Sequence, residues 1–141
     1  MIVRRTVVLD NEAVQVLLDL HHPKHRRLNA IMEAVVHKRK RHPDAVQVVV
    51  PTAVRVEAGW NRTDRRAAGI DRLSIRDHDL GAGAANLAAT IRSTLGVSVA
   101  DAHLGVALQQ TPPPHTVYTN DGRDVRRISE HLGIPAAIVT V

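Results

Sequence analysis

The chain has 141 residues, enough for one ordinary domain that buries most of its apolar surface and too few for a second. It has no cysteine, which excludes disulfides, thiolate zinc sites and cysteine nucleophiles and fits a reducing compartment. Trp60 and Tyr118 are its only aromatic residues, so we expect an aliphatic core and no aromatic platform for stacked bases. Nineteen lysines and arginines against 14 acids favour a polyanionic partner such as nucleic acid, although a basic surface is common in soluble proteins.

Strand-like segments alternate with helical patterns along the whole chain. The first, from Arg5 to Leu9, is a β-branched run typical of a strand buried on both faces, and it ends at Asp10. The other expected strands are Val46 to Val50, Leu73 to Ile75, Thr116 to Thr119 and Ala137 to Val141.

Helices are expected between these strands, and Asn11 is expected to cap the first of them. Their ranges are Glu12 to Leu20, about Arg26 to Lys40, Ala53 to Asn61, His78 to Leu95, a helix beginning at Val99, and Val125 to Leu132. Since parallel neighbours need crossover connections, this alternation predicts a single α/β domain over residues 1–141, with a parallel sheet flanked by helices. No segment is long enough to span a bilayer, and we expect a cytoplasmic protein.

Four acids occupy comparable positions along this pattern. Asp10 and Asp121 follow apolar strands, and Glu57 and Asp101 lie early in helices. Two of them have an ordinary explanation, an ion pair within the helix for Glu57 and the helix dipole for Asp101. In open parallel sheets, however, ligands collect beyond the carboxyl ends of the strands, so all four could face one crevice.

Carboxylates gathered in one crevice repel each other unless a cation lies among them. Mg²⁺ or Mn²⁺ is the natural occupant, because these hard ions prefer oxygen ligands and bridge to phosphate oxygens. An acidic site on a basic protein therefore favours metal-assisted hydrolysis of phosphodiesters.

These acids lie in four ordered motifs, Val-Val-Leu-Asp10, Val-Pro-Thr-Ala-Val-Arg-Val-Glu57, Val-Ala-Asp101-Ala-His-Leu-Gly-Val-Ala and Thr-Asn-Asp121-Gly-Arg-Asp124. In order and spacing they resemble the four acidic motifs of PIN domains along essentially the whole chain. Within that family the sequence looks most like the VapC-type toxins of bacterial toxin–antitoxin operons, which are small single-domain ribonucleases. The resemblance implies a five-stranded parallel sheet with helices on both sides, RNA cleavage dependent on Mg²⁺ or Mn²⁺, a homodimer, and inhibition by a cognate VapB-like antitoxin.

The resemblance also implies roles for particular residues. Asp10, Glu57, Asp101 and Asp121 would be the catalytic, metal-binding acids, and Asp124 a further acid at the metal. Asn120 would orient Asp121. Three arginines that follow the Glu57 helix are expected nearest the entering RNA strand, namely Arg62, Arg65 and Arg66.

Two alternatives remain open at this point. One is a catalytically idle PIN-like module, in which the basic surface binds RNA or a protein and the acids are structural. The other is a phosphatase or phospho-acceptor, although a haloacid-type phosphatase needs an Asp two residues after the first, where this chain has Glu12. The PIN pattern has small or hydroxyl residues after the first acid, so Glu12 is left outside the predicted site. The sequence does not identify the RNA.

Overall fold

The computed structural model describes residues 5–42 and 45–141, without the side chain of Arg39. Its centre is a five-stranded sheet in which every strand pairs with its neighbours in parallel, in the order β3-β2-β1-β4-β5. The strands are β1 (Thr6–Leu9), β2 (Gln47–Pro51), β3 (Arg76–His78), β4 (His115–Thr119) and β5 (Ala136–Thr140). This sheet confirms the predicted fold class.

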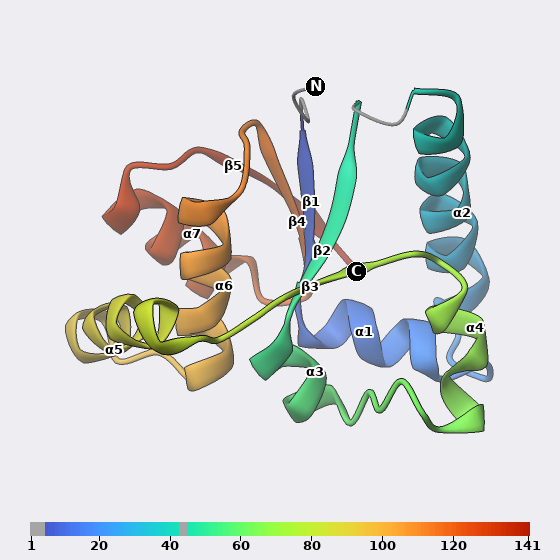
Figure 1. The fold of residues 1–141 in the computed structure, drawn as a ribbon, viewed down its shortest axis with the longest axis horizontal. Helices are drawn as coiled ribbons and strands as arrows, with labels where there is room; N and C mark the ends of the chain where they lie inside the picture. Colours follow the sequence, from blue (N-terminus) through green and yellow to red (C-terminus); the bar gives the residue numbers. More distant parts are fainter. Residues whose placement is uncertain (1–4, 43–44) are drawn as a thin grey trace.

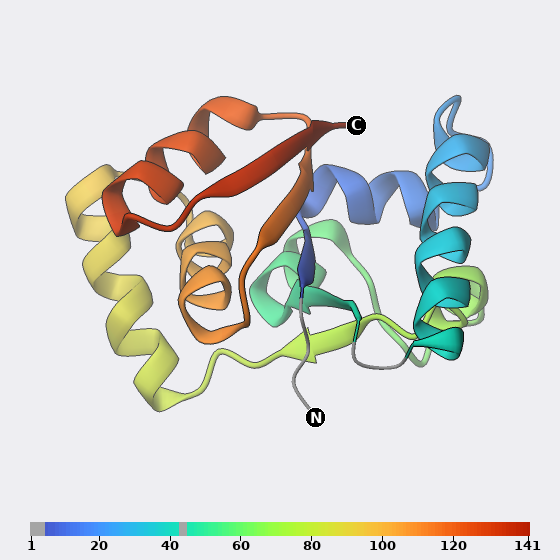
Figure 2. The ribbon, with the colours of Figure 1, turned by 90° about the horizontal axis from the view of Figure 1, so that it is seen from above.

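Helices cover both faces of the sheet, as Figures 1 and 2 show. One layer holds α5 (Ala82–Leu95), α6 (Val99–Gln110) and α7 (Gly122–Leu132). On the opposite side are α1 (Asn11–Leu18), α2 (His25–Arg41) and α4 (Ala68–Asp71), with a short 3₁₀ turn, Arg65–Ala67, before α4. The helix α3 (Thr52–Ala58) begins directly at the end of β2 and packs against α1 and α6.

Strand β1 lies at the centre of the sheet and is buried on both faces. Val7 and Leu9 belong to the cluster formed with α1 and α2, whereas Val8 packs with Leu104 and Val125 of the opposite layer. Each fully buried aliphatic side chain of this size contributes roughly 1.5–3 kcal/mol. The residue that follows β1, Asp10, is therefore held at the end of a strand that is buried along its whole length.

Several details differ from the sequence-based expectations. The short helix α4 was not expected, α3 ends at Ala58 and not at Asn61, and α7 begins at Gly122 and not at Val125. Leu73 and Ile75 are buried but precede β3, which is the polar edge segment Arg76–His78 and is a strand only because it pairs with β2. The helix expected from His78 begins at Ala82. Asp10, and not Asn11, caps α1, because its backbone is extended and its side chain accepts the Asn11 N–H.

No helix in the described ranges is both long and apolar enough to cross a bilayer. The cytoplasmic location stays a prediction.

Candidate active site

Asp10 is the most buried acid of the described chain, with 7% of its surface exposed. Its two carboxylate oxygens have separate partners: Oδ1 accepts the Asn11 backbone N–H at 2.7 Å, and Oδ2 accepts the Thr119 hydroxyl at 2.8 Å. Burial raises the pKa of Asp10 and these two hydrogen bonds lower it, while the charges of Asp121 and Asp124 raise it further. The net direction is upward, so the carboxylate is held in place but is not neutralised by a cation.

Thr119 joins the ends of β1 and β4. It is fully buried, and its hydroxyl donates to Asp10 while accepting the Asp121 backbone N–H at 3.0 Å. Sequence reasoning assigned the orienting role to Asn120, which is exposed. In the structure it is Thr119 that contacts both Asp10 and the Asp121 backbone. The sequence feature that could have indicated Thr119 is a hydroxyl residue two positions before a candidate acid at a strand end.

Asp101 lies in the first turn of α6, where Ser98 caps the helix by accepting the Asp101 backbone N–H at 3.1 Å. The pKa of Asp101 is raised to about 6, mainly by burial and then by the charge of Asp10, with smaller contributions from the charges of Asp124 and Glu57. The hydrogen bond with Ser98 acts in the opposite direction. The charges of three acids from other elements therefore contribute to the raised pKa of Asp101.

The remaining acids are more open to solvent. Glu57 on α3 and Asp121 at the start of α7 are exposed, and Asp124 is half-buried. Asp124 also forms an ion pair with Arg127 at 3.3 Å, one turn along α7. The structure thus brings the five predicted acids to one end of the sheet, with Asp10 and Asp101 at the buried side.

The donor atoms suit a hard divalent cation, because all are carboxylate oxygens and no basic partner of Asp10 or Asp101 lies among the described residues. Within residues 5–42 and 45–141, however, no group of three or more His, Asp or Glu side chains is arranged so that it could hold a metal ion. The acids fit the ion by chemistry and mutual repulsion, while a complete set of ligands is not preformed.

A hollow of about 520 Å³ lies beside Glu57, between α3 and the start of α6. Its walls are mainly apolar and include Val56, Leu80 and Val99. Val56 and Val99 are 82% and 52% exposed. An apolar surface so close to the acids can receive either an uncharged part of a ligand or the side chains of a partner protein.

A chain of hydrogen bonds fixes the start of α3, the helix that carries Glu57. The Ala53 backbone N–H donates to His103 Nδ1 at 3.2 Å, and His103 Nε2 lies 3.0 Å from His78 Nδ1. His78 Nε2 lies 2.9 Å from Gln110 Oε1. Because an amide N–H can only donate, the proton of neutral His103 lies on Nε2, and burial lowers its pKa to about 4. His103 is therefore neutral near pH 7 and holds α3 to α6.

The three arginines predicted to meet RNA lie between α3 and α4 and differ in their contacts. Arg62 contacts Asp77 at 2.9 Å and the Ile75 carbonyl at 2.7 Å, and it stacks over Trp60 at 4.2 Å. Arg66 pairs with its neighbour Asp64, and Arg65 is exposed. Arg62 thus has a structural role, whereas contact of all three with RNA stays a prediction.

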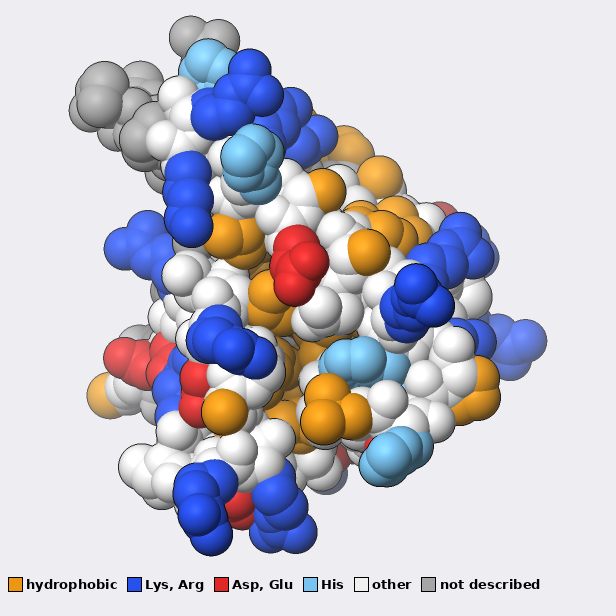
Figure 3. Space-filling view, turned by 90° about the vertical axis from the view of Figure 1, so that its right-hand side faces the viewer, with side chains coloured by type: hydrophobic (Ala, Val, Ile, Leu, Met, Phe, Trp, Pro, Cys, Tyr) orange, Lys and Arg blue, Asp and Glu red, His pale blue; other side chains and the backbone are white. Residues whose placement is uncertain are grey.

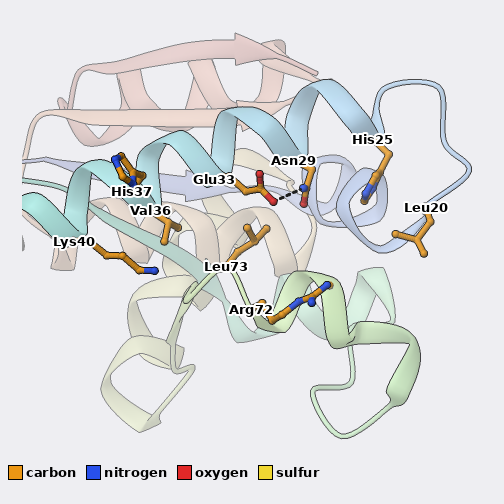
Figure 4. Close-up of a pocket in the computed structure, with 10 residues that line it drawn as sticks. Leu20, His25, Asn29, Glu33, Val36, His37, Lys40, Arg72 and Leu73 are labelled. Atoms are coloured by element: carbon orange, nitrogen blue, oxygen red, sulfur yellow. Dashed lines mark hydrogen bonds between the residues drawn. The ribbon is translucent and has the colours of Figure 1, made fainter.

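A larger hollow of about 710 Å³ lies away from the acids, between α2 and α4. Figure 3 shows this side of the molecule, with basic side chains distributed around apolar surface. Lys40, Arg72 and His37 line the hollow, and Glu33, which accepts a hydrogen bond from Asn29 at 3.1 Å, is its acid (Figure 4). This surface is suited to an anionic or mixed partner rather than to a cation.

Comparison with known proteins gives a match of fold and none of sequence. No family model matches the chain, and neither does any curated protein. Among solved structures, this protein is similar to a chain in the crystal structure of VapBC2 from Rickettsia felis, which was crystallised bound to a DNA fragment from the VapBC2 promoter. The TM-score is 0.56 with 12% identity, over 96% of this chain and 98% of that one. At this identity the match shows a shared fold, in agreement with the PIN-like α/β architecture expected from the acidic motifs.

Proposed function

We propose that the protein is a metal-dependent endoribonuclease, the toxin of a VapBC-type toxin–antitoxin pair. The observation that carries this proposal is that burial and neighbouring carboxylates raise the pKa of both Asp10 and Asp101. Structural acids normally have a basic partner or a solvated position. Within residues 5–42 and 45–141, Asp10 is buried without a basic partner, and Asp101 is half-buried without one. The order of the four motifs and the fold shared with a VapBC2 chain support the same conclusion.

Each acid has a distinct part in the proposed site. Asp10, fixed by Thr119 and the Asn11 amide, is the rigid anchor on β1. Asp101, Glu57 and Asp121 complete the negative field from three helices, and Asp124 adds to it from α7. Asn120 and Thr119 position Asp121 through the turn that joins β4 to α7.

Mg²⁺ or Mn²⁺ bound by Asp10, Glu57, Asp101, Asp121 and Asp124 would supply a water of lowered pKa for attack on the phosphodiester. The chain's own residues hold the ion and, through the net charge of +5, attract the RNA backbone.

The test is cleavage of RNA by the purified protein with Mg²⁺, with Mn²⁺ and with EDTA. We expect cleavage only with a divalent cation, and no cleavage by Asp10→Asn. Glu130→Gln, which changes an exposed acid of α7 outside the site, is the matched control and should cut like the parent. Undiminished cleavage in EDTA contradicts the metal site, and absence of cleavage under every condition favours the idle binding module.

The proposed partner is a VapB-like antitoxin that places a basic or polar side chain among the acids. An arginine fork can satisfy carboxylates that otherwise wait for metal, so inhibition should compete with Mn²⁺. The VapBC2 complex gives a precedent for a partner on this fold. A pull-down from the native host that recovers no small partner protein would count against this proposal.

We also propose a homodimer that covers the exposed Val56 and Val99. Sedimentation should show a dimer at micromolar concentration, and Val56→Asp should shift it toward monomer. A monomeric parent protein contradicts this assignment.

A further inference from the structure

The two edges of the sheet are built differently. At one edge β3 has three residues, and its Asp77 is paired with Arg55 and Arg62 at 2.7 and 2.9 Å. At the other edge β5 has five residues, Ala-Ala-Ile-Val-Thr, with no charge and no proline within the strand. Proteins usually protect an exposed edge with charges, proline, bulges or a short strand, and β5 has none of these.

The free edge of β5 presents alternate backbone groups. The Val141 N–H donates to the Thr119 carbonyl at 2.9 Å, so the amides of Val141 and Val139 point toward β4. Because successive residues of a strand alternate, the N–H and C=O groups of Ile138 and Thr140 point away from β4, toward the edge. These are the groups with which an added strand would pair.

One face of β5 is also open. Its opposite face packs on α7 through Ile138 and Ala136, whereas Ala137 is exposed and Val139 is 36% exposed. A pocket of about 220 Å³ lies on this open side, between β5 and α2, and Tyr118, Val139 and Leu28 form apolar parts of its wall. This volume is suitable for one side chain of an added strand.

Among the described residues, two cations border the pocket and no acid lines it. Lys24 Nζ contacts the Val141 carbonyl at 2.7 Å. Arg27 is exposed, and it has no hydrogen-bond or ion-pair partner within residues 5–42 and 45–141. A partner's side chain that enters this pocket should therefore carry a negative charge.

We propose that the free edge of β5 binds an extended segment of another protein by strand addition, with an acidic side chain of that segment paired to Arg27. Backbone groups of Ile138 and Thr140 supply the affinity, and the pocket beside Val139 supplies the preference among side chains. The site does not use the acid cluster and does not depend on nuclease activity.

A second copy of this chain fits the edge less well. If two copies paired their β5 strands in antiparallel orientation, the residues that precede β5 in one copy would lie opposite the end of β5 in the other copy. Residues 133–141 contain no acid to meet Arg27, and Pro135 lacks an N–H. The partner is therefore a different protein.

The probe is a short end-blocked peptide of alternating valine and threonine with one central glutamate, compared with its glutamine counterpart. We expect the glutamate peptide to bind the full chain in fluorescence anisotropy, and the glutamine peptide to bind roughly threefold more weakly, as for a partly exposed ion pair. Arg27→Glu should abolish this preference, whereas Arg26→Glu, on the adjacent exposed position of α2, should retain it.

The backbone is tested at Thr140. Thr140→Pro removes an edge N–H without removing a bond to β4 and should weaken peptide binding at least tenfold, while Thr140→Ala stays within twofold of the parent. If Thr140→Pro does not fold, hydrogen exchange replaces it: the peptide should slow exchange of the Ile138 and Thr140 amides in the parent. Four outcomes would each overturn the proposal. They are no binding at millimolar peptide, equal peptide binding by a folded Thr140→Pro variant, unchanged hydrogen exchange at the Ile138 and Thr140 amides, and self-association of the parent that Thr140→Pro removes.

Discussion

Neutralising Asp101 should stabilise the metal-free protein, and the effect should depend on pH. The pKa of Asp101 lies at about 6 against an ordinary value of 3.8, mainly because of burial and the charge of Asp10. A carboxyl group with a raised folded-state pKa destabilises the fold where it is ionised. The free energy of unfolding therefore falls as pH rises from about 4 through 6, and this penalty is complete above that range.

The size of the effect follows from the same two values. A difference of this size corresponds to about 3 kcal/mol at most, and screening of a half-exposed group by solvent lowers it to about 1–2 kcal/mol. Asp101→Asn also loses an attraction to the α6 dipole of roughly 0.3–1 kcal/mol. We expect the variant to be more stable than the parent by roughly 0.5–1.5 kcal/mol at pH 7.5, and equal to it within about 0.5 kcal/mol at pH 4.

Urea unfolding of both proteins in EDTA at several pH values measures this difference. Glu130→Gln is the control, since it removes an exposed charge outside the cluster and should show no such pH-dependent gain. The argument would be refuted if Asp101→Asn were less stable than the parent by the same amount at pH 7.5 and at pH 4. Asp101 would then be an ordinary acid at the start of a helix.

Four further outcomes are expected. Thr119→Val leaves the buried Asp10 carboxylate and the Asp121 backbone N–H without their shared partner. The variant should lose roughly 1–3 kcal/mol of stability in urea unfolding and should cleave RNA more slowly. Cleavage at the parent's rate would contradict the positioning role of Thr119. Arg62→Ala should lower the free energy of unfolding by roughly 1 kcal/mol or more through loss of its contacts with Asp77 and Trp60, whereas Arg65→Ala should not. Combined replacement of Arg62, Arg65 and Arg66 by Ala should flatten the salt dependence of RNA binding. Unchanged RNA binding by this triple variant would show that the three arginines do not contact RNA. Mn²⁺ affinity should fall as pH decreases through about 6, because Asp101 takes up a proton there, and a pH-independent affinity measured by calorimetry would exclude Asp101 as a ligand.

The parts of the fold that depend on local pattern could be predicted from the sequence. β1 and β2 are continuous apolar runs, and their burial on both faces follows from that pattern. β3 could not be found in this way, since Arg76–His78 is polar and becomes a strand only by pairing with β2, while the apolar Leu73 and Ile75 lie in the preceding loop.

The site shows the same division. Asp10, Asp101 and Asp121 could be predicted because each follows a strand or begins a helix. Glu57 was expected early in its helix, but α3 ends at Ala58, so Glu57 lies near the end of this helix. The contacts of Thr119 depend on β1 lying beside β4, which joins residues more than a hundred positions apart. The ion pairs of Arg62 depend in the same way on the position of β3, so its structural role is visible only in three dimensions.

The most direct test of the central claim is Mn²⁺ binding, observed as loss of the electron paramagnetic resonance signal of the free ion. The parent and Glu130→Gln should bind Mn²⁺ equally, and Asp10→Asn should lose that binding together with RNA cleavage while remaining folded. Equal Mn²⁺ binding by all three proteins, or RNA cleavage by an Asp10→Asn protein that no longer binds Mn²⁺, would contradict the claim that the acids around Asp10 form a divalent-cation nuclease site.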